Sequence, residues 1–161
     1  MGRTIVIANQ KGGVGKTTTA VNLSACLAVA EQRTLVVDID PQANATSGLG
    51  VVVDDDGDCI YEVLMGGNPL RETILNTELS YLQLLPSHIR LIGAEVELIG
   101  TVARETKLQK ALEGVKDEYQ YVVIDSPPSL GLLTLNALTA ADSIIIPIQC
   151  EYLALEGLTQ L

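Results

Sequence analysis

The amino-acid sequence predicts an α/β fold in which helices cover both faces of a doubly wound, mostly parallel sheet. Hydrophobic residues make up 47% of the chain, which has no Trp and no Phe, so the core must be built from Val, Ile, Leu and Ala. Such a composition suits strands that are buried on both faces. Short β-branched runs also alternate with helical patterns along the chain, as in β–α–β units. At 161 residues, the chain is long enough for one domain over residues 1–161.

The first β–α–β unit spans residues 3–40. The segment RTIVIA (3–8) is a buried strand that ends at a glycine cluster, and RTLVVDID (33–40) is a second strand that ends in two aspartates. Between them, apolar residues recur at helical spacing from Lys16 onward: Ala20, Leu23, Leu27 and Ala30. Parallel strands joined in this way imply a right-handed crossover.

The middle of the chain predicts a turn, two helices and a strand. The acidic segment DDDGD (54–58) indicates a solvated turn, because it lacks the ligand pattern of a calcium-binding EF-hand loop. A short helix is expected over residues 60–66, and a strand over 81–87 that Pro86 stops. One long helix is expected from residue 92 to about residue 114, on the spacing of its apolar residues: Ile92, Val96, Ile99, Val102, Leu108, Leu112 and Val115. His88, the only histidine, is expected at the surface.

The last third predicts two more strands and a helix between them. The strand over residues 119–125 ends at Asp125 and leads into a Pro-rich loop, and the strand over 143–150 follows a helix over 132–141. Another helix begins within residues 151–161, where no capping signal follows the leucines. We therefore expect the chain to be a fragment that lacks the C-terminal part of its domain.

The loop KGGVGKTT (11–18) has the ingredients of a phosphate-binding site. Its glycines let backbone N–H groups curl toward an anion, and the helix beginning near Lys16 directs its positive end to the same place. Lys16 can reach the β- and γ-phosphates of a nucleotide, and Thr17 offers a hydroxyl to Mg²⁺. The strict P-loop pattern fails, because Gln10 stands where its first glycine belongs. From spacing alone, Lys11 is equally consistent with a solvated loop lysine.

Three aspartates follow two predicted strands and supply the carboxylates that a nucleotide site needs. Asp125 ends one strand in the manner of a Walker B aspartate, which usually holds Mg²⁺ through water. Asp38 and Asp40 end another strand, and their spacing puts both side chains on the same side of it. One of these two could support the shell of the metal ion, while the other positions a water molecule.

Several segments, taken together, resemble the ParA/Soj family of DNA-partition ATPases. The loop of residues 11–18 alone is shared with a wider deviant Walker A class, which includes MinD cell-division regulators, nitrogenase iron proteins and arsenical-pump ATPases. The segments DIDPQANATSGLG (38–50) and VVIDSPPSLGLLTLNAL (122–138) narrow the resemblance to the partition branch. It extends through residues 84–98 and 146–161 and so covers essentially the whole chain.

The resemblance implies a P-loop NTPase fold and a role for each residue of the loop. Residues 11–18 (Lys11, Gly12, Gly13, Val14, Gly15, Lys16, Thr17 and Thr18) would bind ATP. Lys16 resembles the phosphate-binding lysine, Thr17 the Mg²⁺ ligand and Thr18 a contact of the α-phosphate. Lys11 is similar to the signature lysine that crosses a dimer interface toward the partner's nucleotide. This gives Lys11 a physical purpose, because a second cation couples dimerisation to the triphosphate state.

The resemblance also assigns roles outside the loop. Asp40 resembles the water-positioning residue of switch I, Asp125 the Walker B aspartate, and residues 126–131 resemble switch II. The implied function is that of an Mg-dependent ATPase acting as an ATP-gated homodimer in plasmid or chromosome partition. A centromere-binding partner of the ParB/Spo0J kind would stimulate hydrolysis, and the dimer would bind DNA without sequence preference.

Charge and hydropathy limit the partners of the residues present. The net charge of −10 argues against DNA binding by this chain itself. Apolar runs are too short to span a membrane, and the N-terminus does not resemble a signal peptide, so a cytoplasmic protein is expected. The alternatives are a MinD-like regulator, which would need an amphipathic membrane helix, and a truncated module that binds nucleotide without hydrolysing it.

Overall fold

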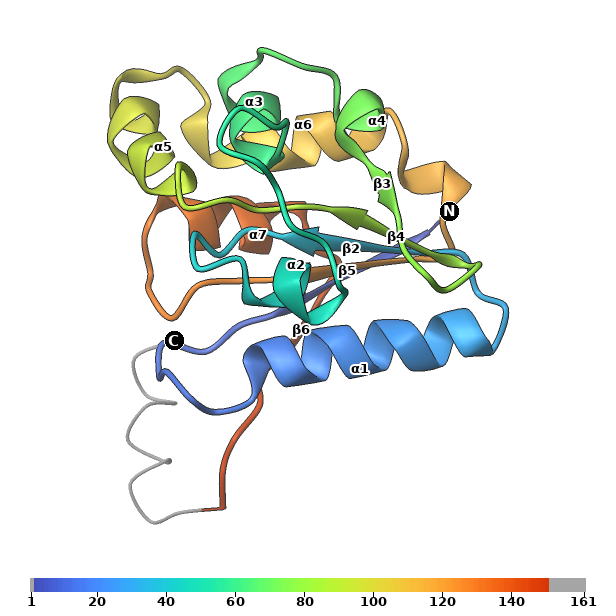
Figure 1. Ribbon diagram of the computed structural model, residues 1–161. Coiled ribbons are helices and arrows are strands. Elements are labelled where there is room, and N and C mark those ends of the chain that lie inside the picture. Colours follow the sequence, from blue (N-terminus) through green and yellow to red (C-terminus); the bar gives the residue numbers. More distant parts are fainter. Residues whose placement is uncertain (1, 151–161) are drawn as a thin grey trace.

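The computed structural model describes residues 2–150 and confirms the predicted α/β fold (Figure 1). Within these residues, the strands form one six-stranded sheet in the order β3-β4-β2-β5-β1-β6, parallel except for the antiparallel pair of β3 and β4. In chain order, the elements are β1 (Arg3–Ile7), α1 (Lys16–Val29), β2 (Thr34–Asp38), α2 (Asn44–Gly48), α3 (Ile60–Met65), α4 (Leu70–Thr73), β3 (Leu75–Asn76), β4 (Leu82–Leu85), α5 (Leu91–Glu97), η1 (Leu98–Gly100), η2 (Arg104–Thr106), α6 (Lys107–Glu113), η3 (Lys116–Glu118), β5 (Tyr121–Asp125), α7 (Leu132–Ala140) and β6 (Ser143–Ile145).

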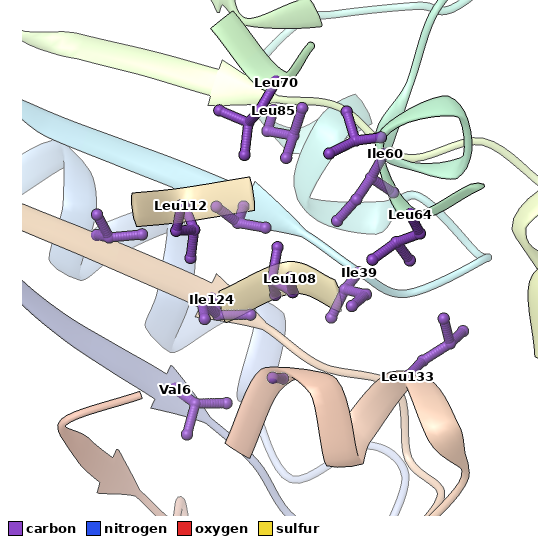
Figure 2. Close-up of a cluster of buried hydrophobic side chains, with 14 of the residues drawn as sticks. Val6, Ile39, Ile60, Leu64, Leu70, Leu85, Leu108, Leu112, Ile124 and Leu133 are labelled. Atoms are coloured by element: carbon purple, nitrogen blue, oxygen red, sulfur yellow. The ribbon is translucent and has the colours of Figure 1, made fainter. Parts of the chain in front are cut away.

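Helices cover both faces of the sheet, and alternate residues of each central strand pack against opposite layers (Figure 1). All five residues of β2 are buried. Leu35 and Val37 belong to the larger core with α3, α5, α6 and α7, whereas Val36 packs with Ala28 of α1. Figure 2 shows the larger core, in which Leu108 and Leu112 of α6 belong to the same cluster as strand residues such as Ile124. The high content of Val, Ile and Leu is thus explained by strands that have no solvent-facing side.

The central strands bring three chain segments to one edge of the sheet. β5 lies between β1 and β2, and it pairs in parallel with both. Their carboxyl ends therefore meet, with Ile7 opposite Asp125 and Asp125 opposite Asp38. This edge is where ligands bind in open α/β sheets.

The prediction of one long helix over residues 92–114 is wrong. α5 ends at Glu97, and α6 begins only at Lys107, after two short 3₁₀ turns and a break at Ala103, whose φ of 54° is left-handed. The apolar residues of the first half face solvent: Ile92, Val96, Ile99 and Val102 are between 55% and 89% exposed. Those of the second half, Leu108, Leu112 and Val115, are buried as expected. α5 packs through Leu91 and Ala94 instead, so the helical spacing of Ile92 and Val96 lies on its exposed face.

The strand predicted over residues 143–150 is shorter than expected. β6 ends at Ile145, and Pro147, which has no N–H, cannot extend the ladder. The chain turns instead toward the glycine-rich loop, where Asn9 Nδ2 donates to the Pro147 carbonyl at 2.9 Å and Gln149 Nε2 to the Gly13 carbonyl at 3.0 Å. The helix expected within residues 151–161 lies outside the described residues.

Some features had no counterpart in the sequence predictions. The short elements α2, α4 and β3 were not expected, and His88 is not a free surface residue. Its side chain is only 15% exposed, and its Nδ1 accepts a hydrogen bond from Arg90 Nε at 3.2 Å. None of the helices within residues 2–150 is both long enough and apolar enough to cross a membrane.

Candidate functional site

The glycine-rich loop connects β1 to α1 and forms an open cradle. Gly13 and Gly15 have φ angles of 73° and 89°, in the left-handed region that glycine adopts without strain. A Cβ atom built on Gly12, Gly13 or Gly15 would meet nothing within 4 Å. No atom of residues 2–150 therefore fills the space beside the loop, and the first backbone N–H groups of α1 lie next to it without helical partners.

Lys16 is the buried cation of this loop. Only 6% of the residue is exposed, and its Nζ donates to the Lys11 carbonyl at 2.9 Å. Burial lowers the pKa of the Lys16 ammonium, although the nearby carboxylates of Asp125 and Asp40 act in the opposite direction. Lys11 differs from Lys16, because its residue is exposed and, within residues 2–150, its ammonium makes no ion pair.

Asp38 and Asp125 stand side by side at the ends of β2 and β5, and both are fully buried. Asp38 has a donor for each oxygen: Oδ1 accepts from the Asp40 N–H at 3.1 Å, and Oδ2 accepts from the N–H and hydroxyl of Thr46 at 2.8 and 2.7 Å. Neither oxygen of Asp125 has a hydrogen-bond partner among residues 2–150. Two aspartates at equivalent strand ends therefore have opposite hydrogen-bonding environments.

Both carboxyl groups have raised pKa values. Burial raises the pKa of Asp125 to about 7. The nearby Thr17 hydroxyl and the charge of Lys16 oppose this rise, whereas the charges of Asp38 and Asp40 add to it. Burial also raises the pKa of Asp38 to about 6, against the hydrogen bonds from Thr46 and Asp40. A desolvated carboxylate without donors is costly unless a cation completes it.

Asp40 lies beyond the end of β2 and faces the glycine-rich loop. It is 6% exposed and lines a cavity of about 480 Å³ with loop residues that include Gly12, Gly13 and Thr17. Its Oδ1 accepts from the Gln42 N–H at 2.9 Å. Of the predicted residues, Lys16, Thr17 and Asp40 line this cavity. Asp125 does not line it but is close enough for its charge to act on Lys16, and Lys11 does not line it either.

Asp38 was predicted as a metal-supporting residue, and its surroundings favour another role. Because Asp38 already accepts three hydrogen bonds, a cation would compete with Thr46 and Asp40 for this carboxylate. Asp125 would have to release nothing. Within the described residues, no cluster of three or more His, Cys, Asp or Glu side chains could hold a metal ion alone.

Known proteins match this chain along its whole length. A family model described as an AAA domain matches residues 2–161. The chain is 58% identical over 161 residues to the sporulation initiation inhibitor protein Soj of Bacillus subtilis, and 60% identical over 161 residues to the chromosome partitioning protein ParA of Myxococcus xanthus. The chain belongs to the ParA/Soj family. All of it aligns, but it spans only 64% and 57% of the lengths of these two relatives.

A solved structure extends the likeness of this ParA/Soj chain to three dimensions. Cobyrinic acid a,c-diamide synthase from Mycobacterium smegmatis, solved with a bound ATP analogue and magnesium, superposes with a TM-score of 0.95 at 43% identity. The match covers 99% of this chain and 65% of that chain.

The candidate site also includes residues that the sequence did not predict. Gln42, Asn44 and Pro128 line the cavity, and Gln149 reaches the glycine-rich loop from beyond β6. Gln42 and Asn44 lie within the segment DIDPQANATSGLG, so the motif pointed to their region without indicating which side chains face the cavity. The contact of Gln149 depends on a turn after β6 that carries no such signal.

Proposed function

We propose that this ParA/Soj chain binds ATP with Mg²⁺ at the glycine-rich loop and hydrolyses it as part of an ATP-gated partition switch. The observation that carries the proposal is a buried lysine, Lys16, within electrostatic reach of the unsatisfied carboxylate of Asp125 and beside an open cradle of backbone N–H groups. Such a pair has little purpose in an empty fold, since both groups lose hydration and neither is fully compensated. The names of the relatives support partition, and the solved neighbour supports the ligand class.

The phosphates would lie against the loop. Backbone N–H groups of Gly13 and Gly15 and the N-terminus of the 14-residue helix α1 offer donors and a positive partial charge. Lys16, which donates to the Lys11 carbonyl in the free protein, would turn its ammonium to the β- and γ-phosphates. The absence of any atom within 4 Å of the missing Cβ positions gives the phosphates room.

Thr17 and Asp125 are the residues that would hold the magnesium ion, Asp125 through water. The unsatisfied oxygens of Asp125 fit such an ion, and Mg²⁺ commonly takes one or two protein ligands with waters and substrate phosphates. When bound, the ion would neutralise charge on the phosphates. We assign Asp38 to the support of Asp40 instead, because its oxygens are occupied.

Asp40 would orient the attacking water. It is the carboxylate that lines the cavity beside the loop, and its backbone and Oδ1 are both fixed by hydrogen bonds. A water held by Asp40 on the far side of the γ-phosphate could attack in line, with Lys16 stabilising the charge that develops.

Lys11 would act on the partner's nucleotide in an ATP-dependent homodimer. Lys11 is exposed and its ammonium makes no ion pair with any residue of 2–150, which leaves it available to a second copy of the chain. In the full-length protein, such a dimer would bind DNA without sequence preference, and a centromere-binding partner would stimulate hydrolysis. The excess of acidic residues makes DNA binding by residues 1–161 alone unexpected.

Binding and turnover of ATP test the proposal. Lys16→Ala should weaken the binding of a fluorescent ATP analogue with Mg²⁺ by about 100-fold or more, because the buried cation of the loop is lost. The matched control is Lys110→Ala, which removes an exposed lysine far from the cavity. Equal affinity of the Lys16→Ala variant and the parent would refute the site.

Asp40→Ala tests hydrolysis separately from binding. We expect unchanged affinity for the analogue and a fall of about 100-fold in kcat. The control is Asp117→Ala, an exposed carboxylate on η3. A parent chain that binds ATP through Lys16 but shows no turnover would identify the non-hydrolysing module instead.

The role of Lys11 is tested by sedimentation with a non-hydrolysable ATP analogue. Lys11→Ala should remain monomeric at concentrations where the parent and Lys110→Ala dimerise. If Lys11→Ala dimerises as readily as the parent, the lysine does not act across the interface.

A further inference from the structure

A buried hydrogen-bond network behind Asp40 links three separate segments of the chain. We propose that Thr46 and Ser87 are positioning residues, which hold Asp40 in place for the water-orienting role given above. This inference rests on the proposed hydrolysis, but the network itself is a property of the free protein. Neither residue contacts the proposed nucleotide site in the way that Asp40 does, since neither lines the cavity.

The backbone of Asp40 is held on both sides. Its N–H donates to Asp38 Oδ1 at 3.1 Å, and its carbonyl accepts from Ser87 Oγ at 2.7 Å. Removing either bond would loosen one of the two peptide groups that flank the Asp40 side chain. The position of the Asp40 carboxylate therefore depends on where Asp38 and Ser87 are fixed.

Thr46 makes hydrogen bonds to both Asp38 and Ser87. Its hydroxyl donates to Asp38 Oδ2 at 2.7 Å and accepts from the Ser87 N–H at 2.9 Å, while its own N–H donates to Asp38 Oδ2 at 2.8 Å. The ring of contacts closes from Asp40 through Asp38, Thr46 and Ser87 back to Asp40. A single hydroxyl thus joins the end of β2, the helix α2 and the loop after β4.

Burial makes the network sensitive to the loss of a single group. Thr46 is 2% exposed and Ser87 is 1% exposed, so water has little access to replace a missing hydroxyl. Buried polar groups that lose a partner keep the cost of their desolvation, which shifts the backbone or opens the segment.

The turn between Asp40 and α2 needs this support. Ala43 has a left-handed φ of 52°, which is unfavourable for a residue with a Cβ, and its N–H donates to the Asp40 carbonyl at 2.9 Å. Strained residues of this kind persist where the surroundings determine the conformation. The bond from Ser87 Oγ to the same carbonyl supplies part of that determination.

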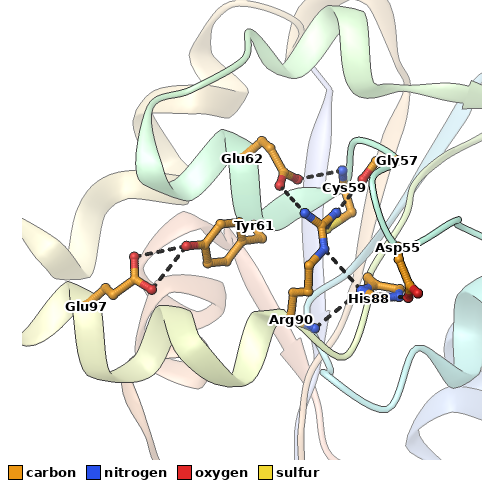
Figure 3. Close-up of polar contacts among 8 residues, drawn as sticks. All are labelled: Asp55, Gly57, Cys59, Tyr61, Glu62, His88, Arg90 and Glu97. Carbon is orange, nitrogen blue, oxygen red and sulfur yellow. Dashed lines mark hydrogen bonds and ion pairs between the residues drawn. The ribbon is translucent and has the colours of Figure 1, made fainter.

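The loop that carries Ser87 is itself braced from the other side, as Figure 3 shows for its neighbours. Arg90 Nη1 pairs with Glu62 Oε1 of α3 at 2.9 Å, and Arg90 also donates to the Gly57 carbonyl. The Ile60 N–H donates to the Pro86 carbonyl at 2.9 Å. These contacts hold the loop of Ser87 against α3 and the turn before it, and so they restrict the position of the Ser87 hydroxyl.

The consequence for chemistry is a loss of turnover without a loss of binding. A small displacement of the group that orients the attacking water lowers the rate, because reacting atoms must be aligned. The phosphate contacts of the glycine-rich loop do not pass through Thr46 or Ser87, so nucleotide affinity should not change. This separation distinguishes positioning from a general structural role.

The test compares Thr46→Val and Ser87→Ala with matched controls elsewhere in the core. Thr34→Val removes a buried hydroxyl at the opposite end of β2, where it donates to the Gln32 carbonyl, and Ser24→Ala removes one inside α1. Thr46→Ser keeps the bridging hydroxyl and serves as the conservative variant. Each protein is measured for ATP turnover, for affinity toward a fluorescent ATP analogue with Mg²⁺, and for amide hydrogen exchange of residues 39–46.

We expect Thr46→Val and Ser87→Ala to lower kcat by about 10-fold, with affinity for the analogue changed less than about threefold. Amides of residues 39–46 should exchange about 5- to 10-fold faster in both, because the segment opens more readily. The two controls and Thr46→Ser should resemble the parent in kcat and in the exchange of residues 39–46. If Thr46→Val does not fold, Ser87→Ala, which removes only the bond to the Asp40 carbonyl, decides the matter.

Parent-like exchange of residues 39–46 in Ser87→Ala would overturn the network as a support of Asp40. Faster exchange with a parent-like kcat, in a parent that requires Asp40 for turnover, would overturn its role in positioning. Failure of the proposed function looks different: the parent itself would then bind or hydrolyse no ATP, while hydrogen exchange would still report on the network.

Discussion

Asp38 and Asp125 offer a comparison within one sheet edge. They are the same residue type, they stand opposite each other in the β2–β5 pairing, and both are 0% exposed. In the part of the chain that the structure describes, Asp38 accepts three hydrogen bonds from backbone and hydroxyl donors, whereas Asp125 accepts none. Burial alone therefore does not tell a structural carboxylate from a ligand-binding one; the supply of donors does.

The difference indicates what each site is built for. A carboxylate whose oxygens are satisfied by the protein organises the chain around it, as Asp38 does for the turn that carries Asp40. A carboxylate left unsatisfied in the interior lowers stability until a cation or proton arrives. Folding of the free protein thus retains a cost at Asp125 that ligand binding can remove.

The largest expected effect is a gain of stability on neutralising Asp125. At pH 8, Asp125→Asn should raise the free energy of unfolding of the nucleotide-free protein by about 3 kcal/mol, because the buried charge is removed and only a neutral amide must be desolvated. Urea unfolding measures the change. The gain should be absent if Mg²⁺ and nucleotide are bound to the parent, which then has a cation near Asp125.

The pH dependence of the stability gain of Asp125→Asn identifies its cause. The folded-state pKa of Asp125, about 7, lies above the unfolded value, so the folded protein binds the proton more tightly. The cost of ionising Asp125 is therefore absent below about pH 4, grows as the pH rises toward 7 and is constant above it. The advantage of Asp125→Asn should shrink accordingly between pH 7 and pH 4. An advantage that is the same at pH 5 and pH 8 would mean that buried charge is not responsible.

A smaller change of opposite sign is expected at Asp38. Asp38→Ala should lower the free energy of unfolding at pH 8 by about 2 kcal/mol, since the unpaired donors of Asp40 and Thr46 outweigh the relief of a buried charge. Asp125→Ala is the matched control, because it removes the same group without leaving a donor unpaired. Equal destabilisation by the two alanine substitutions would contradict the distinction drawn here.

The smallest of the three effects concerns Mg²⁺-dependent nucleotide affinity. Because Asp125 must be ionised to attract the metal ion, the parent should bind a fluorescent nucleotide with Mg²⁺ about 10-fold more weakly at pH 6 than at pH 8. Chelation of Mg²⁺ with EDTA should remove most of this dependence. Asp125→Asn, titrated with the same nucleotide, isolates the contribution of the nucleotide's own ionisation, and a pH dependence as steep as that of the parent would count against Asp125.

Much of the site could be predicted from sequence because its groups lie at the ends of strongly apolar strands. Asp38 and Asp125 follow runs that can only be buried strands, and parallel pairing brings such ends to one edge. Lys16 and Thr17 follow from the loop motif in the same way. Each of these residues could be located within its own segment, and the pairing of the strands brings the segments together.

The network behind Asp40 could not be predicted, because it depends on contacts between distant segments. Ser87 meets Thr46 only because β4 pairs with β2 in a register that sets Leu85 opposite Val37. The prediction of one long helix failed for a related reason: the sequence shows the apolar spacing of Ile92 and Val96 but not that this face stays exposed in the described fold. A periodic pattern identifies a helical face, whereas its partner is decided by tertiary packing.

The most direct measurement is the location of a bound metal ion. Crystals of the chain grown with a non-hydrolysable ATP analogue and Mn²⁺ would reveal the ion by its anomalous scattering. The account predicts the ion on the Thr17 and Asp125 side of the cavity, with the bonds from Thr46 to Asp38 Oδ2 intact. An ion coordinated directly by Asp38, with those bonds broken, would contradict it.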